Sequence, residues 1–320
     1  MSDPLLEVHN LSVLFSNAGH EIHAVRNLSL TLQTGEVLTI LGESGSGKSV
    51  TLNAILRLLP ENGTTVSGKV IVDGQDVFAM TNREVRAYRG AKVSMVFQEP
   101  ALAFDPMFTV GYQIIETLRA HRNISIDEAE RRALELMELV RIPSAKVCMR
   151  RYPHEMSGGM RQRAMIALAL CCDPKVLLAD EPTTALDVTV QIQMLVLLRE
   201  LQRELGMAIV FVTHDIGVAN EISDHVAVMY AGRVVECGAA LDVLGNPKHP
   251  YTKALLESSI HGTDRGQRLP VIPGAPPDLA EMSQGCSFAP RCALANQYCL
   301  RELPDLRPVT TNHLAACINI

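Results

Sequence analysis

A glycine-rich stretch offers the clearest chemistry in this chain. Residues 42–49 fit the spacing G-x-x-x-x-G-K-[ST], in which glycines let backbone N–H groups turn toward one anion. The lysine of this pattern reaches terminal phosphates, and the hydroxyl after it holds Mg²⁺. We therefore predict that this stretch, here called the P-loop, binds ATP. Its candidate binding residues, with the one that follows, are Gly42, Glu43, Ser44, Gly45, Ser46, Gly47, Lys48, Ser49 and Val50.

Two acidic residues end a later apolar run. Asp180 and Glu181 follow residues 176–179, which are typical of a buried strand. An aspartate at the carboxyl end of a parallel strand can hold Mg²⁺ through water, and the adjacent glutamate can orient an attacking water. An ordinary acidic pair at a strand end is the alternative. His214 follows another strand-like run, 208–212, at the same predicted sheet edge as the P-loop, which favours a phosphate contact.

Three further positions are candidates on local grounds. Ser157 is a plausible N-cap of a helical pattern, and Gly158 and Gly159 after it allow a ligand to approach the backbone; a plain capping turn is the alternative. Phe15 precedes a turn, where it can stack on a base or pack as a strand residue. Gln98 follows the short strand-like run 93–97.

Four of the eight cysteines lie near the C-terminus. Cys286, Cys292, Cys299 and Cys317 have the spacing C-x5-C-x6-C-x17-C. Four thiolates can hold a [4Fe–4S] cluster. They can also hold zinc, although the C-x2–4-C spacing of zinc knuckles is absent. Reduced thiols without a metal are the third reading, and disulfides are not expected in a cytoplasmic chain.

Composition restricts the class of protein. The 320 residues are 47% hydrophobic with a net charge of −6 and a pI of about 5.9, which argues against a nucleic-acid partner. The first residues lack a signal-peptide pattern, and no apolar run approaches the ~20 residues that span a bilayer. We expect a soluble, cytoplasmic chain whose membrane role comes through partners.

The pattern of elements predicts an α/β fold. Strand-like runs alternate with helical patterns through residue 215, which predicts a mostly parallel sheet that binds ligands at its carboxyl ends. We expect strands at 6–15, 24–32, 37–41 and 67–73, and helices at 48–59, 160–172 and 188–205 and within 109–140. The first strands and a hairpin at 226–236 are expected as antiparallel additions. Prolines become frequent from about residue 245, where one short helix, 252–259, is expected.

Taken in order, these motifs resemble the ATP-binding subunit of an ABC transporter. The resemblance covers residues 5–320 and implies a P-loop NTPase fold with a helical subdomain at about 100–170. It implies a nucleotide-binding domain at 1–244 and an extension at 245–320. By resemblance the P-loop is Walker A, and Phe15 is the adenine-stacking residue. The other matches are Gln98 (Q-loop), Ser157–Gly159 (signature), Asp180 (Walker B), Glu181 (catalytic glutamate), residues 185–187 ending in Asp187 (D-loop) and His214 (switch histidine).

The tail resembles oligopeptide and dipeptide importer ATPases, most closely the D-type subunit of dipeptide importers. This similarity rests on residues 246–252 and 285–292. It implies uptake of peptides or related small solutes, such as nickel chelates. Similar tails carry a [4Fe–4S] cluster, which favours that reading for the four cysteines.

The resemblance also implies partners and roles. It implies that Ser49, Gln98 and Asp180 hold Mg²⁺. It also implies a second ATPase subunit, for which a paralogue is favoured over a second copy of this chain. Two membrane permeases and, indirectly, a solute-binding protein complete the assembly at the cytoplasmic face of the inner membrane. Met160 departs from the family's usual glutamine after the signature glycines, which puts hydrogen bonding there in doubt.

Two other functions remain open from the sequence. One is a soluble ABC ATPase of translation or repair, although such chains usually carry two cassettes or a long inserted coiled coil, and this chain has one Walker A. The other is a redox-responsive interaction module, suggested by the cysteine tail.

Overall fold

The computed structural model describes residues 3–17, 20–184, 186–258, 271–282 and 284–320. They divide into two compact units. The first, here the P-loop unit, comprises Leu6–Thr31, Val37–Ile71 and Val212–Ile320; the second, here the helical unit, comprises the remainder, chiefly Val72–Phe211. In the described part of the chain, no helix combines the length and apolar character needed to cross a membrane.

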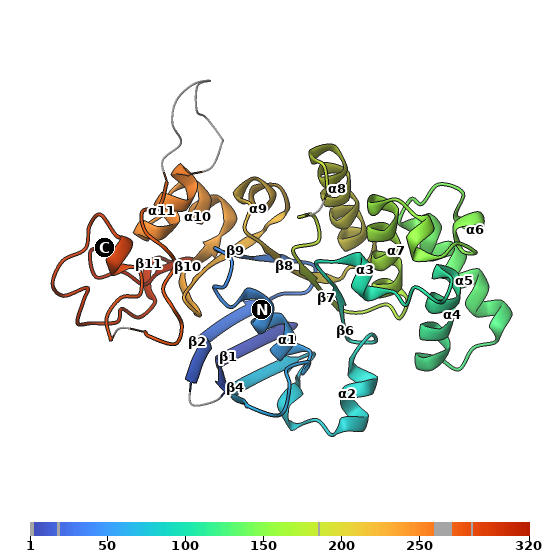
Figure 1. Ribbon diagram of the computed structural model, residues 1–320, viewed down its shortest axis with the longest axis horizontal. Coiled ribbons are helices and arrows are strands. Elements are labelled where there is room, and N and C mark those ends of the chain that lie inside the picture. Colours follow the sequence, from blue (N-terminus) through green and yellow to red (C-terminus); the bar gives the residue numbers. More distant parts are fainter. Residues whose placement is uncertain (1–2, 18–19, 185, 259–270, 283) are drawn as a thin grey trace. The chain divides into compact units, whose positions relative to one another are not determined.

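Two sheets form the P-loop unit. The first has the order β2-β1-β4, and these strands lie side by side (Figure 1). The strands of the second sheet that belong to this unit have the order β11-β12-β10-β9-β3. The strand bounds are β1 (Leu6–Asn17), β2 (His20–Leu32), β3 (Val37–Leu41), β4 (Thr64–Val72), β9 (His225–Tyr230), β10 (Arg233–Ala239), β11 (Arg307–Thr310) and β12 (His313–Ala315).

The hairpin of β9 and β10 corrects one expectation. Its two strands are antiparallel and turn at Ala231 and Gly232, which have φ values of 49° and 79°. However, β9 runs parallel to β3, with Ile40 opposite Ala227. The first strand of the hairpin therefore belongs to the parallel part of the sheet, and only β10 is an antiparallel addition. The consecutive buried or nearly buried residues of β9 fit a strand covered on both faces.

Helices α1 (Lys48–Ile55), α9 (Ile216–Ile222), α10 (Ala240–Gly245) and α11 (Pro250–Glu257) belong to the same unit. Helix α1 is shorter than the predicted 48–59 because Arg57 adopts a left-handed φ of 52°, which ends the helix. Helix α11 begins two residues before the predicted helix, whose last residue, Ser259, lies outside the described residues.

The C-terminal extension continues the sheet of the P-loop unit. Strand β12 pairs antiparallel with β10, placing Ala315 opposite Glu236, and β11 pairs with β12 at the edge. The sequence did not predict these two short strands, since Pro308 interrupts the pattern and proline is tolerated only on an edge strand. Tyr230, Tyr251 and Phe288 form an aromatic cluster in the core between the sheet and the extension.

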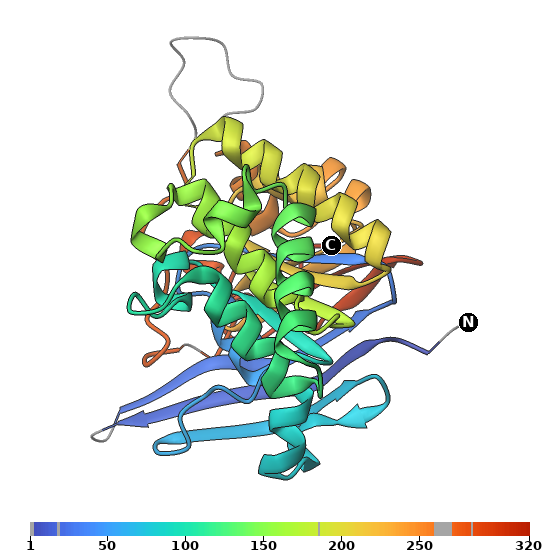
Figure 2. The ribbon, with the colours of Figure 1, turned by 90° about the vertical axis from the view of Figure 1, so that its right-hand side faces the viewer.

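The helical unit contains parallel strands and a group of helices. Strands β6 and β7 are parallel, with Met95 opposite Leu178. Helices α4, α5 and α7 pack against one another (Figure 2). Thr109, Ser125 and Ser157 cap their first turns. The bounds are β5 (Gln75–Asp76), α2 (Asn82–Tyr88), β6 (Val93–Val96), α3 (Pro100–Ala103), α4 (Val110–His121), α5 (Ile126–Leu139), α6 (Ala145–Cys148), α7 (Gly158–Leu170), β7 (Val176–Asp180), α8 (Val188–Leu205) and β8 (Ala208–Thr213, mostly in this unit).

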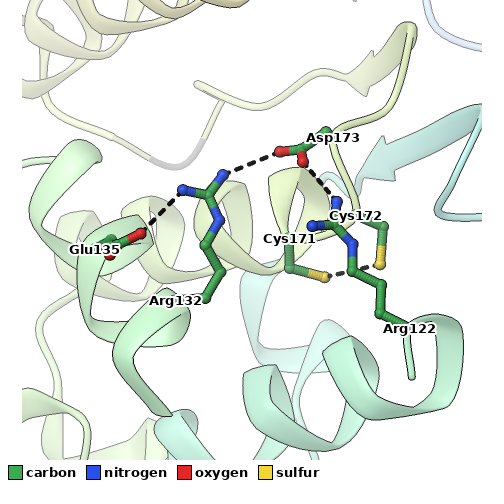
Figure 3. A network of polar contacts seen from close by, with 6 residues as sticks. All are labelled: Arg122, Arg132, Glu135, Cys171, Cys172 and Asp173. Carbon is green, nitrogen blue, oxygen red and sulfur yellow. Dashed lines mark hydrogen bonds and ion pairs between the residues drawn. The ribbon is translucent and has the colours of Figure 1, made fainter. Parts of the chain in front are cut away.

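A polar network joins three of these helices. Asp173, just after α7, accepts from Arg122 at the end of α4 and from Arg132 of α5 (Figure 3). Arg132 also contacts Glu135 one turn along α5. One carboxylate thus ties the ends of α4 and α7 to the side of α5.

Candidate nucleotide-binding site

The P-loop is shaped by glycines that no other residue can replace. Strand β3 is buried along its whole length and delivers the chain to Gly42. A Cβ on Gly42 would lie 2.2 Å from the carbonyl oxygen of Met229. Gly47 caps α1 with a φ of 101°, and a Cβ there would lie 2.3 Å from the carbonyl oxygen of Ala24. Neighbouring backbone carbonyls therefore lie so close to Gly42 and Gly47 that a residue with a Cβ would clash with them, and only glycine fits at these two positions.

Lys48 and Ser46 give the loop its polar interior. Lys48 is 5% exposed, and its ammonium donates to the carbonyl oxygens of Gly42 and Glu43, at 2.8 and 3.0 Å. The Ser46 hydroxyl is buried and finds no hydrogen-bond partner among the described residues. A buried hydroxyl without a partner is costly, and a phosphate oxygen would satisfy it. Ser49 is exposed in the first turn of α1, where an oxygen ligand can meet Mg²⁺.

Phe15 and His214 belong to the same unit as the P-loop. Phe15 is half-buried in β1, and His214 is exposed directly after β8. Asp215 follows and caps α9 by accepting from the N–H groups of Gly217 and Val218. The histidine thus sits between the end of a buried strand and the start of a helix.

The acidic pair lies in the helical unit. Asp180 ends the buried strand β7 and is 7% exposed. Glu181 has a φ of 43°, a left-handed conformation that is uncommon for a non-glycine residue and that is often found at functional sites. Its Oε2 accepts from the Thr184 hydroxyl at 3.0 Å. Gln98 is exposed beyond the end of β6 in the same unit.

The residues predicted to form the signature and the D-loop begin two helices of the helical unit. The Ser157 hydroxyl accepts from the N–H of Met160. At the start of α7, Ser157 and Gly158 are exposed and Gly159 is partly exposed. Asp187 caps α8 by accepting from the N–H of Val190 at 3.0 Å. Ala185, the first residue of the predicted D-loop, lies outside the described residues.

The four tail cysteines line one small cavity of the P-loop unit. The N–H of Cys286 donates to the carbonyl oxygen of Cys299 at 2.8 Å, and Asn319 donates its N–H to the Cys317 sulfur. All eight cysteines have free thiols. Within the described residues, no three His, Cys, Asp or Glu side chains are placed to bind one metal ion. The predicted iron–sulfur site therefore has no direct support here beyond the shared cavity.

Two residues that contact the P-loop were missed from the sequence. Arg291 and Tyr251, both in the extension, hydrogen bond with Glu43. More than 200 positions separate them from the loop, and no local pattern reports such a contact.

Comparison with known proteins decides the family. Residues 25–184 match the family model described as ABC transporter, and residues 235–299 match the model described as oligopeptide/dipeptide transporter, C-terminal region. The chain is 46% identical to a probable peptide ABC transporter ATP-binding protein of Sinorhizobium fredii, over 99% of this chain and 95% of that protein. The chain belongs to the ABC transporter family.

Two further relatives of this ABC transporter chain support the same family assignment. A probable D,D-dipeptide transport ATP-binding protein of Escherichia coli is 46% identical, over 98% of this chain and 95% of that protein. A dimeric ATP-binding cassette solved in a post-hydrolysis state with ADP and Pi is 30% identical, with a TM-score of 0.66, and the match covers 73% of this chain and 98% of that one. None of these names supports a soluble ABC ATPase or a redox module.

Proposed function

We propose that this ABC transporter chain binds and hydrolyses ATP to power the uptake of peptides. The order of the two matched regions carries this proposal: an ATP-binding cassette precedes a C-terminal region of the oligopeptide/dipeptide type in one chain. The names of the relatives, which are peptide and D,D-dipeptide transport ATP-binding proteins, support the substrate class.

The P-loop would hold the triphosphate. Its backbone N–H groups and the start of α1 favour an anion, and Lys48 would exchange its carbonyl partners for phosphate oxygens. By the family resemblance, Ser49, Gln98 and Asp180 would supply oxygen donors of the kind that suits Mg²⁺, and the ion would neutralise charge on the transferred phosphoryl group. Phe15 would stack on the adenine.

Glu181 would orient the attacking water. Its backbone adopts a left-handed conformation directly after β7, and the Thr184 hydroxyl donates to one carboxylate oxygen. The other carboxylate lone pairs can accept from water, and its negative charge favours the hydroxide that develops as the water attacks. His214, exposed after β8, would hold or sense the γ-phosphate.

A second ATPase subunit would complete the site. Ser157 and Gly158 at the start of α7 are suited to donate to the γ-phosphate of a nucleotide held by another cassette. Asp187 would lie at the same interface. The related solved cassette is dimeric, which supports this arrangement, and the Met160 departure favours a paralogue as partner.

Two membrane permeases would dock on the helical unit. A groove of about 690 Å³ runs between α4, α5 and α6, and four basic and two acidic side chains are among its lining. Phe108 and Tyr112 stack at its edge with 5.0 Å between ring centroids, and both are exposed. We assign this groove to a cytoplasmic helix of a permease. The chain would then lie at the cytoplasmic face of the inner membrane.

The tail cysteines would hold a [4Fe–4S] cluster. In such a cluster each thiolate binds a different iron, so the four sulfurs need not converge on one ion as zinc requires. Four free cysteines around one cavity and N–H groups directed at two of the sulfurs fit that donor set. Anaerobic purification tests this: a broad absorption near ~400 nm with bound iron supports the cluster, and its absence contradicts it.

Co-purification tests the proposed function. The tagged native chain is extracted from its own membranes in mild detergent and its companions are identified. Two membrane subunits and a second ATPase support the proposal and decide between homodimer and heterodimer, while an associated solute-binding protein identifies the peptide class. A complex with ribosomes or nucleic acid, without membrane subunits, contradicts it.

A further inference from the structure

The side chain of Glu43 in the P-loop is clamped by an arginine of the C-terminal extension. Arg291 Nη1 lies 2.7 Å from one carboxylate oxygen of Glu43, and Nη2 lies 3.0 Å from the other. The guanidinium is held in turn, because Nε donates to the carbonyl oxygen of Pro273 at 2.9 Å. With a side chain only 6% exposed, Arg291 offers Glu43 a fixed, two-point partner.

The C-terminal extension also holds the backbone of Glu43. Its N–H donates to the hydroxyl of Tyr251 at 2.9 Å. Tyr251 is fully buried and packs against Tyr230 at 4.5 Å between ring centroids, while Arg291 also donates to the Tyr230 hydroxyl. The second residue of the P-loop is therefore positioned at both its backbone and its side chain by the aromatic core of the extension.

The charge of Glu43 gives this clamp a function. Glu43 is the second residue of a loop that gathers N–H groups and Lys48 around a polyphosphate, so an unpaired carboxylate there would repel the ligand. A paired carboxylate presents little net charge, and the bidentate geometry also stops it from competing for Lys48. Burial of Arg291 keeps the pair from being screened by salt as an exposed pair would be.

We propose that Arg291 and Tyr251 are positioning residues for ATP binding, which neutralise Glu43 and hold it so that the P-loop accepts the phosphates. This inference rests on the proposed function and adds a role for the extension in nucleotide binding. Arg291 is the last residue of the short helix η3 (Ala289–Arg291), which lies between Cys286 and Cys292 in the sequence.

A double-mutant cycle on the full chain tests the charge argument. Dissociation constants of MgATP and MgADP are measured for wild type, Arg291→Gln, Glu43→Gln and the double variant. We expect Arg291→Gln to weaken MgATP binding about tenfold, equivalent to about 1.4 kcal/mol, and MgADP binding less, because ADP carries less charge. In the Glu43→Gln background, where no carboxylate remains to be neutralised, the same change is expected to cost less than about threefold.

Two further variants separate positioning from folding. Arg291→Lys retains the charge but loses the two-point geometry, so it is expected to recover only part of the affinity that Arg291→Gln loses. Tyr251→Phe keeps the ring packing while removing the acceptor for the Glu43 N–H, which is expected to raise the KM for ATP more than it lowers kcat. Equal losses on Arg291→Gln in the wild-type and Glu43→Gln backgrounds, or equal losses for MgATP and MgADP, would overturn the inference. So would unchanged affinity in Arg291→Gln and Tyr251→Phe. A wild-type chain that binds no MgATP would instead contradict the proposed function.

Discussion

Glu236 and His313 form a buried pair, with Oε1 of the carboxylate 2.7 Å from Nε2 of the ring. The carboxylate also accepts from the N–H groups of Lys248 and His249, at 2.6 and 2.9 Å. One side chain of β10 thus joins β12 and the chain entering α11. This contact ties the extension to the sheet from which the P-loop emerges.

Replacement of Glu236 by alanine is expected to destabilise the fold strongly. Three buried hydrogen bonds to the carboxylate would be lost at once, and each buried donor left without an acceptor costs roughly 1–3 kcal/mol. Denaturant unfolding of the purified chain measures the loss. Glu221→Ala, on the exposed side of α9, serves as the control and is expected to change stability by less than about 0.5 kcal/mol. Equal stability of the two variants would show that the Glu236 contacts contribute nothing.

Replacement of Gly47 by alanine is expected to abolish nucleotide binding. The φ of 101° and the nearby Ala24 carbonyl leave no room for a Cβ, so the loop must distort where it begins α1. A loss of at least about 100-fold in MgATP affinity is expected, because the converging N–H groups would be displaced. Gly245→Ala is the matched control, since a Cβ there meets no atom within 4 Å. Comparable affinity in both variants would be incompatible with the P-loop geometry.

The ion pairs of Asp73 are expected to make stability depend on acid pH. Hydrogen bonds from Lys175 and Lys92 hold the pKa of Asp73 below its usual value of 3.8. Because the folded pKa is lowered, the pairs stabilise the fold fully above the unfolded pKa and lose their effect as pH falls through the folded pKa. Asp73→Asn should cost about 1 kcal/mol at pH 7, with a difference from wild type that shrinks below about pH 4. Denaturant unfolding at several pH values checks this, and a constant difference down to about pH 2 would refute it.

Glu181→Gln is expected to stop turnover while keeping ATP binding. Glutamine fills the same space but accepts a water proton poorly, so the bound nucleotide persists and the paired cassettes remain associated. Single-turnover hydrolysis and size-exclusion chromatography with MgATP provide the two readouts. Normal turnover by this variant would remove Glu181 from its proposed role, whereas loss of ATP binding would show a structural one.

Local signals predicted much of this fold. Short apolar runs set the boundaries of β3 and β7, and Asp187 caps the start of α8. Such signals involve only neighbouring residues, so the sequence alone reports them. Ser157 was predicted as an N-cap for the same reason, and its hydroxyl accepts the expected N–H. The P-loop could be predicted because the spacing of its glycines, lysine and serine indicates both a tight turn and a phosphate ligand.

Contacts between distant segments could not be predicted in this way. The parallel pairing of β9 with β3 and the joining of β12 to β10 depend on tertiary structure, which periodicity does not report. The same holds for the clamp of Arg291 on Glu43. The predicted boundary at residue 244 and the predicted roles of the individual site residues remain predictions.

ATP hydrolysis by the chain assembled with its membrane subunits in lipid tests the central claim most directly. The account predicts MgATP hydrolysis that rises when a peptide-loaded binding protein is added and that disappears in Lys48→Ala and Glu181→Gln. An assembly that hydrolyses no ATP, or whose hydrolysis ignores both substitutions and the loaded binding protein, would contradict it.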